Sequence, residues 1–142
     1  MKRIILLLCI GIVIACNSEV SKLSEEFKTK MDLAIEAHDE VMPKMGKMGS
    51  LINDLETNID SLNRDSFESA MKDLQLGHDR MMGWMKTFGK DFTPQEIQDG
   101  IQTTNLDSIK IKLQLLEKNY AAAEDMKRLV NSAIENAETL LK

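Results

Sequence analysis

Residues 27–62 read FKTKMDLAIEAHDEVMPKMGKMGSLINDLETNIDSL, and the spacing of their apolar side chains predicts the fold. Apolar residues and one histidine recur three or four positions apart, at Phe27, Met31, Ala34, His38, Val41, Met45, Met48, Ile52, Leu55, Ile59 and Leu62. This spacing lines one face of a helix and predicts a long amphipathic helix over residues 20–62. Pro43 lies inside it. Because a proline removes a backbone hydrogen bond and clashes with the preceding turn, we expect a kink near residues 39–43.

The same spacing predicts two further long helices, over residues 65–89 and 106–141. Asp65 is the expected capping residue of the first of them, and Gly89 its expected end. Residues 93–96 read Thr-Pro-Gln-Glu, which is a helix-start signal and predicts a short helix near residues 94–102. The apolar series that define the second and last helices are Phe67, Met71, Leu74, His78, Met81, Met85 and Phe88, then Ile109, Leu113, Leu116, Tyr120, Ala123, Val130, Ala137 and Leu141.

The composition agrees with a fold made only of helices. The chain has two prolines, no strand-like run of β-branched and aromatic residues, and abundant Lys, Glu, Leu, Met and Ala. Short connections make consecutive helices antiparallel neighbours. We therefore predict an all-α, antiparallel up-down bundle over residues 25–142, with three long helices, or four if the kinked first helix counts as two.

The N-terminus has the pattern of a bacterial lipoprotein signal. Lys2 and Arg3 precede an apolar run, residues 4–15, that is too short to span a membrane but has the length of a signal peptide. The run ends in Val-Ile-Ala-Cys, which resembles the box at which a cysteine receives lipid and the signal is cleaved. We predict a signal peptide over residues 1–15, lipid on Cys16 and a tether over residues 16–24. An ordinary secretory signal with a chance cysteine is the alternative.

The predicted signal peptide and lipid anchor limit where the protein can be located and what it can contact. Cys9 would leave with the signal peptide and Cys16 would carry acyl chains, so no thiol would remain for a disulfide. The acyl chains would hold the protein at a membrane surface. Asn17 is not the aspartate that retains lipoproteins at the inner membrane of enteric bacteria. We therefore expect the outer membrane, on its periplasmic side in preference to the cell surface.

The charge balance excludes one large class of partner. Removal of Lys2 and Arg3 leaves 16 basic and 23 acidic side chains, for a formal net charge of about −7. Nucleic acid binding needs a basic footprint, and attraction to anionic lipids needs basic side chains as well. We expect neither, and we expect a protein partner in the envelope instead. The sequence contains no nucleophile elbow and no phosphate-binding loop, so we expect a protein that is not an enzyme.

One repeated pattern carries a second hypothesis. The only two histidines each begin the pattern His-Asp-x-x-Met-x-x-Met, at His38 and at His78, forty residues apart. On a helix, positions i, i+4 and i+7 share a face, and the predicted antiparallel pairing brings the two segments together. In that pairing His38 lies at the level of Lys90. The residues of the predicted cluster are His38, Met42, Met45, Met48, His78, Met81, Met82 and Met85.

The chemistry of this set leaves three interpretations open. Thioether and imidazole ligands suit monovalent copper or silver, and Trp84 could cover such a metal. A His/Met pair inside a helical bundle is also a ligand set of b-type haem. Methionines at these positions can equally be core packing, since methionine fills irregular gaps. Gly46, Gly49 and Gly83 would allow close approach of helices there, or leave space for a ligand.

Three segments resemble a known group of proteins. They are residues 38–46 (HDEVMPKMG), 81–88 (MMGWMKTF) and 131–138 (NSAIENAE). The chain resembles a family of short exported lipoproteins of Bacteroidetes that is often labelled "viral A-type inclusion protein". The resemblance extends over most of the mature chain. It implies a lipoprotein address and a helical fold, and it implies no activity.

Overall fold

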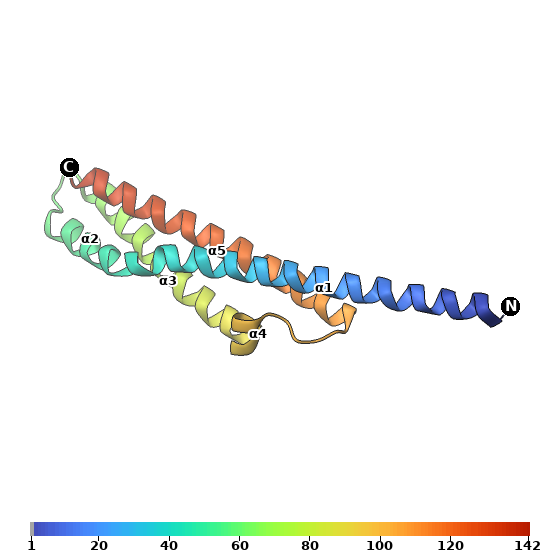
Figure 1. Ribbon diagram of the computed structural model, residues 1–142. Helices are drawn as coiled ribbons and strands as arrows, with labels where there is room; N and C mark the ends of the chain where they lie inside the picture. Colours follow the sequence, from blue (N-terminus) through green and yellow to red (C-terminus); the bar gives the residue numbers. More distant parts are fainter. Residues whose placement is uncertain (1) are drawn as a thin grey trace.

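The computed structural model describes the backbone of residues 2–142 and the side chains from residue 18 onward, and its described part contains helices and no strand (Figure 1). The all-α bundle prediction is confirmed. The predicted signal peptide and the lipid site at Cys16 lie outside the residues whose side chains are described. The elements are α1 (Lys2–Val41), the 3-10 helix η1 (Met42–Lys44), α2 (Met45–Thr57), α3 (Arg64–Asp91), α4 (Pro94–Asp99) and α5 (Leu106–Leu140).

Three long rods make up the bundle. The first is α1 with α2, the second is α3, and the third is α5, which packs against both α1 and α3 (Figure 1). The second half of the first rod, α2, packs against α3. The chain's N-terminal end extends beyond one end of the bundle, and the C-terminus lies at the other, near the α2–α3 connection. Among the residues whose side chains the structure describes, no helix is long and apolar enough to cross a membrane.

The predicted kink is confirmed. At residues 42–44 the α-helix is replaced by a 3-10 turn with Pro43 in its first positions. The cause is the missing N–H of proline and the clash of its ring with the preceding turn. The apolar face keeps its phase across this turn, because Val41 before it and Met48 after it are both fully buried. The first rod is therefore one bent element with a continuous buried face.

The predicted end of the first rod was wrong by five residues, whereas the predicted start of α3, at residue 65, differs from the observed start at Arg64 by one. The helix predicted to reach residue 62 ends at Thr57, and Leu62 is 95% exposed. The reason is a local hydrogen-bonding alternative, because the Asp60 carboxylate accepts bonds from the backbone N–H groups of Leu62 and Asn63. The capping position of α3 is Asn63, and Asp65 lies in the first turn instead.

The ends around α4 differ less from the prediction. α3 passes through Gly89 to Asp91, because burying Phe92 against the core outweighs the low helix propensity of one glycine. The capping box before α4 is confirmed, with Thr93 Oγ1 accepting from the Glu96 N–H at 3.2 Å and the Glu96 carboxylate accepting from the Thr93 N–H at 2.8 Å. α4 ends at Asp99 because Gly100 adopts a φ of 81°.

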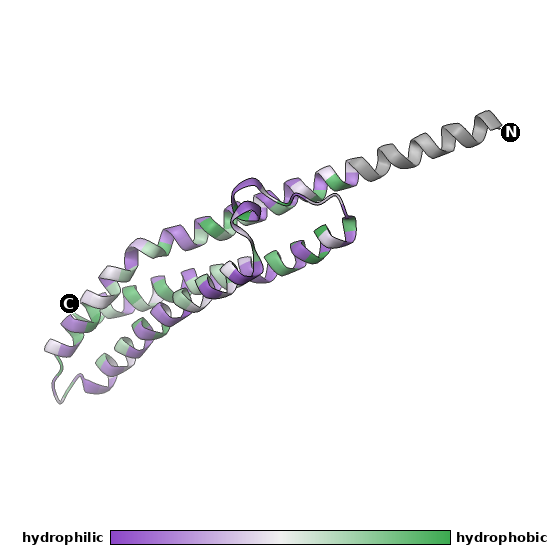
Figure 2. Cartoon of the chain, turned by 90° about the horizontal axis from the view of Figure 1, so that it is seen from below, coloured by the Kyte–Doolittle hydropathy of each residue, from purple (hydrophilic) through white to green (hydrophobic). Residues whose placement is uncertain are grey.

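The hydrophobic core runs along the bundle and is built by one face of each rod. Apolar and polar residues alternate along every described helix, as the green and purple segments of Figure 2 show. The largest fully buried side chains come from all three rods and are Phe27, Met31, Met48, Leu55, Leu74, Met81, Ile109, Leu116, Val41 and Val130. Their burial against one another supplies the main stabilisation of the fold.

The rods approach one another closely at Gly77 of α3. A Cβ atom placed on it would lie 2.8 Å from the Met48 Cε of α2 and 3.3 Å from a Val130 methyl of α5. Gly46, Gly49 and Gly83 were predicted either to allow close approach of helices or to leave space for a ligand. Each of those has open space where a Cβ would stand. Gly77, which begins no recognisable motif, faces the two neighbouring rods directly.

Replacing Gly77 by leucine should therefore destabilise the bundle. The larger side chain must displace both Met48 and Val130, and overpacking of this kind costs about 1–3 kcal/mol. The same replacement at Gly89, in the same helix with open space around it, should raise stability by about 0.5–1 kcal/mol through helix propensity. Urea unfolding of the bundle without its signal peptide measures both. Equal effects of the two replacements would contradict the packing of Gly77.

Candidate functional site

The structure divides the predicted methionine cluster between the core and the surface. Met48 and Met81 are 1% exposed and belong to the hydrophobic core, and Met45 is partly buried against it. Met42, Met82 and Met85 are instead 56%, 53% and 44% exposed. Core packing therefore accounts for Met48 and Met81, as one of the three interpretations expected. The exposed methionines need another account.

The two histidines also occupy different environments. The His38 ring stacks on the Trp84 ring with 5.4 Å between centroids, and its Nδ1 lies 2.8 Å from the Asp39 carboxylate. His38 Nε2 is buried and has no hydrogen-bond partner. His78 is half-exposed, with its Nδ1 3.6 Å from the Asp79 carboxylate. The two imidazoles therefore lie in different environments, one stacked on Trp84 and the other at the surface.

The predicted level of His38 was wrong. It was expected beside Lys90, whereas the structure stacks it on Trp84. The cause lies in the α2–α3 connection, which occupies residues 58–63 and is centred earlier than residue 64. The shift places His38 at one end of a row of rings. Trp84 and Phe88 are 4.5 Å apart, Phe88 and Phe92 are 5.1 Å apart, and Phe92 meets Phe27 at 6.0 Å.

This row of rings gives Trp84 a packing role. One face of the indole covers His38 of α1, and Phe88 stacks with the same ring system. Aromatic pairs of this kind add about 0.5–1.5 kcal/mol each beyond the area they bury. In the residues whose side chains are described, no group of three or more His, Cys, Asp or Glu side chains could hold a metal ion. A metal site here would have to use methionine ligands.

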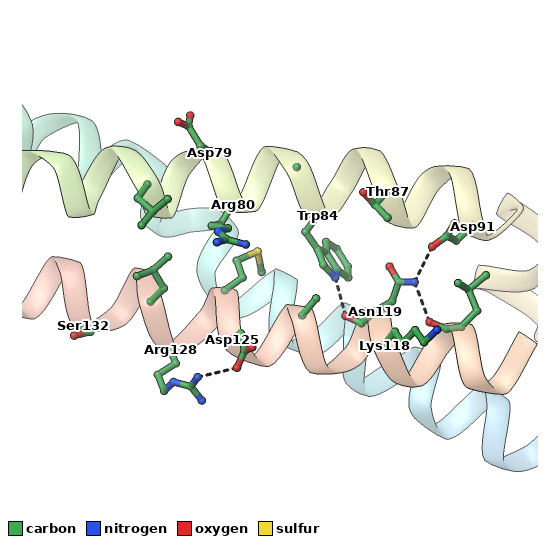
Figure 3. Close-up of a pocket in the computed structure, with 16 residues that line it drawn as sticks. Asp79, Arg80, Trp84, Thr87, Asp91, Lys118, Asn119, Asp125, Arg128 and Ser132 are labelled. Atoms are coloured by element: carbon green, nitrogen blue, oxygen red, sulfur yellow. Dashed lines mark hydrogen bonds and ion pairs between the residues drawn. The ribbon is translucent and has the colours of Figure 1, made fainter.

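A groove with a volume of about 1020 Å³ lies between α3 and α5 (Figure 3). Its apolar lining comes from large side chains of both helices, and small residues at its middle leave the space open. Neither histidine lines it. The apolar and small lining residues are Leu76, Gly83 and Trp84 of α3 with Leu115, Ala122, Met126 and Leu129 of α5.

A buried polar network fixes the floor of this groove. The Trp84 indole N–H donates to the Asn119 carbonyl at 2.9 Å, and the Asn119 amide donates to the Asp91 carboxylate at 2.8 Å (Figure 3). The same amide donates to the Leu115 carbonyl at 3.0 Å. Asn119 is only 5% exposed, so these bonds replace the water it loses. They lock the indole against α5.

The rim of the groove is charged, with equal numbers of each sign. Asp125 and Arg128 form an ion pair at 2.7 Å on the exposed side of α5, and Asp91 accepts the hydrogen bond from Asn119 (Figure 3). The groove also contains the only tryptophan of the chain and two of its four arginines. The charged rim residues are Asp79, Arg80, Asp91, Lys118, Asp125 and Arg128.

Sequence reasoning missed this groove. It placed Trp84 beside a metal, and it treated the charges on α3 and α5 as solvated. Asn119 gave no signal, because a polar residue at the edge of an apolar series is usually exposed. The available signal was the width of the apolar stripe on the last helix, where Met126 and Leu129 lie beside the main series. A stripe too wide for the predicted neighbours leaves apolar surface uncovered.

A second polar cluster joins the kink to α5. Glu40 accepts hydrogen bonds from the Asn131 amide at 3.1 Å and from Lys44 at 3.2 Å, and Lys44 also donates to Asn131 at 2.7 Å. Lys127 lies 3.7 Å from the other Glu40 oxygen. The hydrogen bonds from Asn131 and then Lys44 hold the pKa of Glu40 below its usual value of 4.5. The cluster fixes α1, η1 and α5 to one another.

Comparisons with family models, with curated proteins and with solved structures find no match to the chain. The resemblance to the Bacteroidetes lipoproteins therefore stays a prediction. The geometry of the groove is therefore the basis for its function. That geometry is a long groove between two helices with an aromatic and aliphatic lining and a rim of both signs.

The Glu40 cluster predicts a pH dependence with a definite sign. A carboxylate whose pKa is lowered on folding stabilises the fold at pH above 4.5, and that contribution is lost as the pH falls through the lowered value. Replacing Asn131 by alanine should move the Glu40 pKa back towards 4.5, whereas Ser132→Ala should leave it unchanged. A carbon-detected NMR titration of the glutamate carboxyls measures this. A Glu40 pKa that is unchanged by Asn131→Ala would contradict the hydrogen bond from Asn131 as the cause of the lowered pKa.

Proposed function

We propose that this chain is a lipid-anchored protein of the bacterial envelope that binds another protein surface and catalyses no reaction. The observation that carries the proposal is the α3–α5 groove. Arginine is enriched at the energetic centres of protein interfaces, and two of the four arginines of the chain, Arg80 and Arg128, line the groove beside the exposed Leu76. An apolar hollow with a polar rim is the anatomy of such an interface.

The shape of the groove indicates what kind of surface fits it. Two helices flank it, and the lining runs from Leu76 to Asp91 on α3, which is about 22 Å of helix. On α5 it runs from Leu115 to Ser132, about 25 Å. A groove of this length between two helices accepts the apolar face of further helices, as in four-helix bundles. The proposed partner is therefore a helical protein surface.

The anchor is supported by the N-terminal sequence. Lys2 and Arg3, the apolar run and the box ending at Cys16 together favour lipid on that cysteine. The proposed location is the outer membrane, on its periplasmic side. A tether confines the bundle to a layer near the membrane, where a protein partner is met at a raised effective concentration.

Cys16→Ala should abolish lipid attachment. In a bacterial host grown with a tagged palmitate, the natural chain should carry the label, and the Cys16→Ala variant should lack it and keep its signal peptide. Cys9→Ser is the matched control, because Cys9 lies in the predicted signal peptide, and it should retain the label. Intact mass of the purified chain reports both cleavage and acylation. Removal of residues 1–15 with no label on Cys16 would instead indicate an ordinary secretory signal.

A soft-metal role is the second proposal, and one observation favours it. His78, Met82 and Met85 are all substantially exposed and share one face of α3 at positions i, i+4 and i+7. An imidazole and two thioethers are ligands suited to Cu(I) or Ag(I). The proposal is therefore narrowed from the eight predicted residues to these three, with Met42 on the surface of the neighbouring rod.

Titration with Cu(I) against a competing chelator tests this second role. Replacing Met82 and Met85 together by leucine should reduce the affinity at least tenfold, because both thioethers are removed. Replacing the buried Met48 and Met81 by leucine should leave it unchanged, since leucine packs as well as methionine in a core. Binding weaker than micromolar in the natural chain, or an equal loss in both variants, would overturn the metal role.

A further inference from the structure

The two helices of the groove lie in a register that the contacts fix. Gly77 of α3 lies beside Val130 of α5, and Trp84 of α3 lies beside Asn119 of α5. The helices therefore run antiparallel, and each step towards the end of α3 matches a step towards the start of α5 (Figure 1). This register decides which rim residues stand at the same height along the groove.

Wherever a charged rim side chain of α3 lies level with one of α5 along the groove, the two side chains have opposite charges. Asp91 bonds to Asn119, the neighbour of Lys118, and the register places the other charges within about one turn of an opposite charge. The opposed pairs are Asp79 with Arg128, Arg80 with Asp125, and Asp91 with Lys118.

A surface with this pattern is complementary to itself. A half turn about an axis parallel to the groove places α3 of one copy over α5 of another at unchanged heights. Each rim charge then faces the opposite charge of the second copy. A partner of a single sign would instead meet half of these charges as like charges, which costs energy and disfavours it.

The apolar residues match under the same operation. Leu76, which is exposed in the single chain, stands near the height of Leu129, so the two leucines would pack across the interface. Gly83 stands near the height of Ala122, and these small residues let the backbones of two copies approach at the centre of the groove. The product is a four-helix layer made of two α3 and two α5 helices.

The anchor selects this axis over the other two-fold arrangement. Rotation about an axis parallel to the helices keeps both chains pointing in one direction, so both N-termini emerge at the same end (Figure 1). An axis across the helices would place them at opposite ends. Two acyl anchors in one membrane are compatible only with the first.

We propose that the α3–α5 groove is the interface of a parallel homodimer of this chain. The inference rests on the proposed function, since it takes the groove as the binding face and Cys16 as the anchor. Arg80 and the Asp125 of a second copy form its central ion pair, and each dimer contains this pair twice. Confinement of both copies to one membrane raises their effective concentration and favours association.

Charge exchange between Arg80 and Asp125 tests the dimer. The lipidated full-length protein, purified in detergent, should have the protein mass of two chains by size-exclusion chromatography with light scattering. Arg80→Asp and Asp125→Arg should each reduce it to one chain, because like charges then face each other twice. The double variant should be dimeric again, and so should an equal mixture of the two single variants, in which both pairs are opposite in sign.

A size change at Gly83 provides an independent test. Gly83→Leu fills the centre of the groove without a clash inside one chain, since open space surrounds the position. It should abolish the dimer and leave the helical circular dichroism and thermal unfolding of the monomer intact. Gly89→Leu lies outside the groove and should leave the dimer unchanged. A natural chain that is monomeric, or single charge variants that stay dimeric, would overturn the inference.

Failure of the dimer is distinguishable from failure of the proposed function. A monomeric chain that still carries palmitate on Cys16 would refute self-association and keep the lipid-anchored protein, whose groove would then take a different helical surface. A chain without lipid that still forms the Arg80-dependent dimer would refute the anchor. Recovery of the dimer by the double charge variant is the outcome that only the proposed interface explains.

Discussion

The apolar stripe of α5 is wider than two neighbouring helices can cover, and the rest of the structure depends on this constraint. One part of the stripe, with Ile109, Leu116 and Val130, is buried by α1 and α3. Leu115 and Leu129 lie beyond that contact and line the groove. Burial of apolar surface drives helix packing, so the stripe both assembles the three rods and leaves one face of the assembly unfinished.

The kink in the first rod allows this arrangement. With it, His38 stacks on Trp84 and Met48 reaches Gly77. Glu40 and Lys44 then bind Asn131 of α5 directly at the bend. The stacked His38 ring and the Asn119 carbonyl together hold Trp84 in place at the floor of the groove.

The two sides of α3 are chemically different, and this separates the two proposed roles. One flank carries Arg80, Gly83 and Trp84 towards α5 and the groove. The other flank carries His78, Met82 and Met85 towards solvent. A helix has room for both because its residues spread around a full turn. Occupation of the groove by a second copy would leave the methionine flank exposed, so the two proposals do not compete for the same residues.

The sequence by itself determined the class of fold, because periodic burial and proline chemistry are local properties. The three rods, the kink at Pro43 and the capping box at Thr93 were all predictable from residues a few positions apart. The turn at residues 58–63 was not, since Asp60 competes for the backbone there and shifts the register of everything after it. Only the tertiary structure could separate Met48 and Met81 in the core from Met82 and Met85 on the surface, and only it could bring Trp84, Asn119 and Arg80 to one groove. The physical reason is that the exposure of a side chain depends on which neighbouring helix covers its face. The sequence of one helix does not specify how much of that face its neighbours cover.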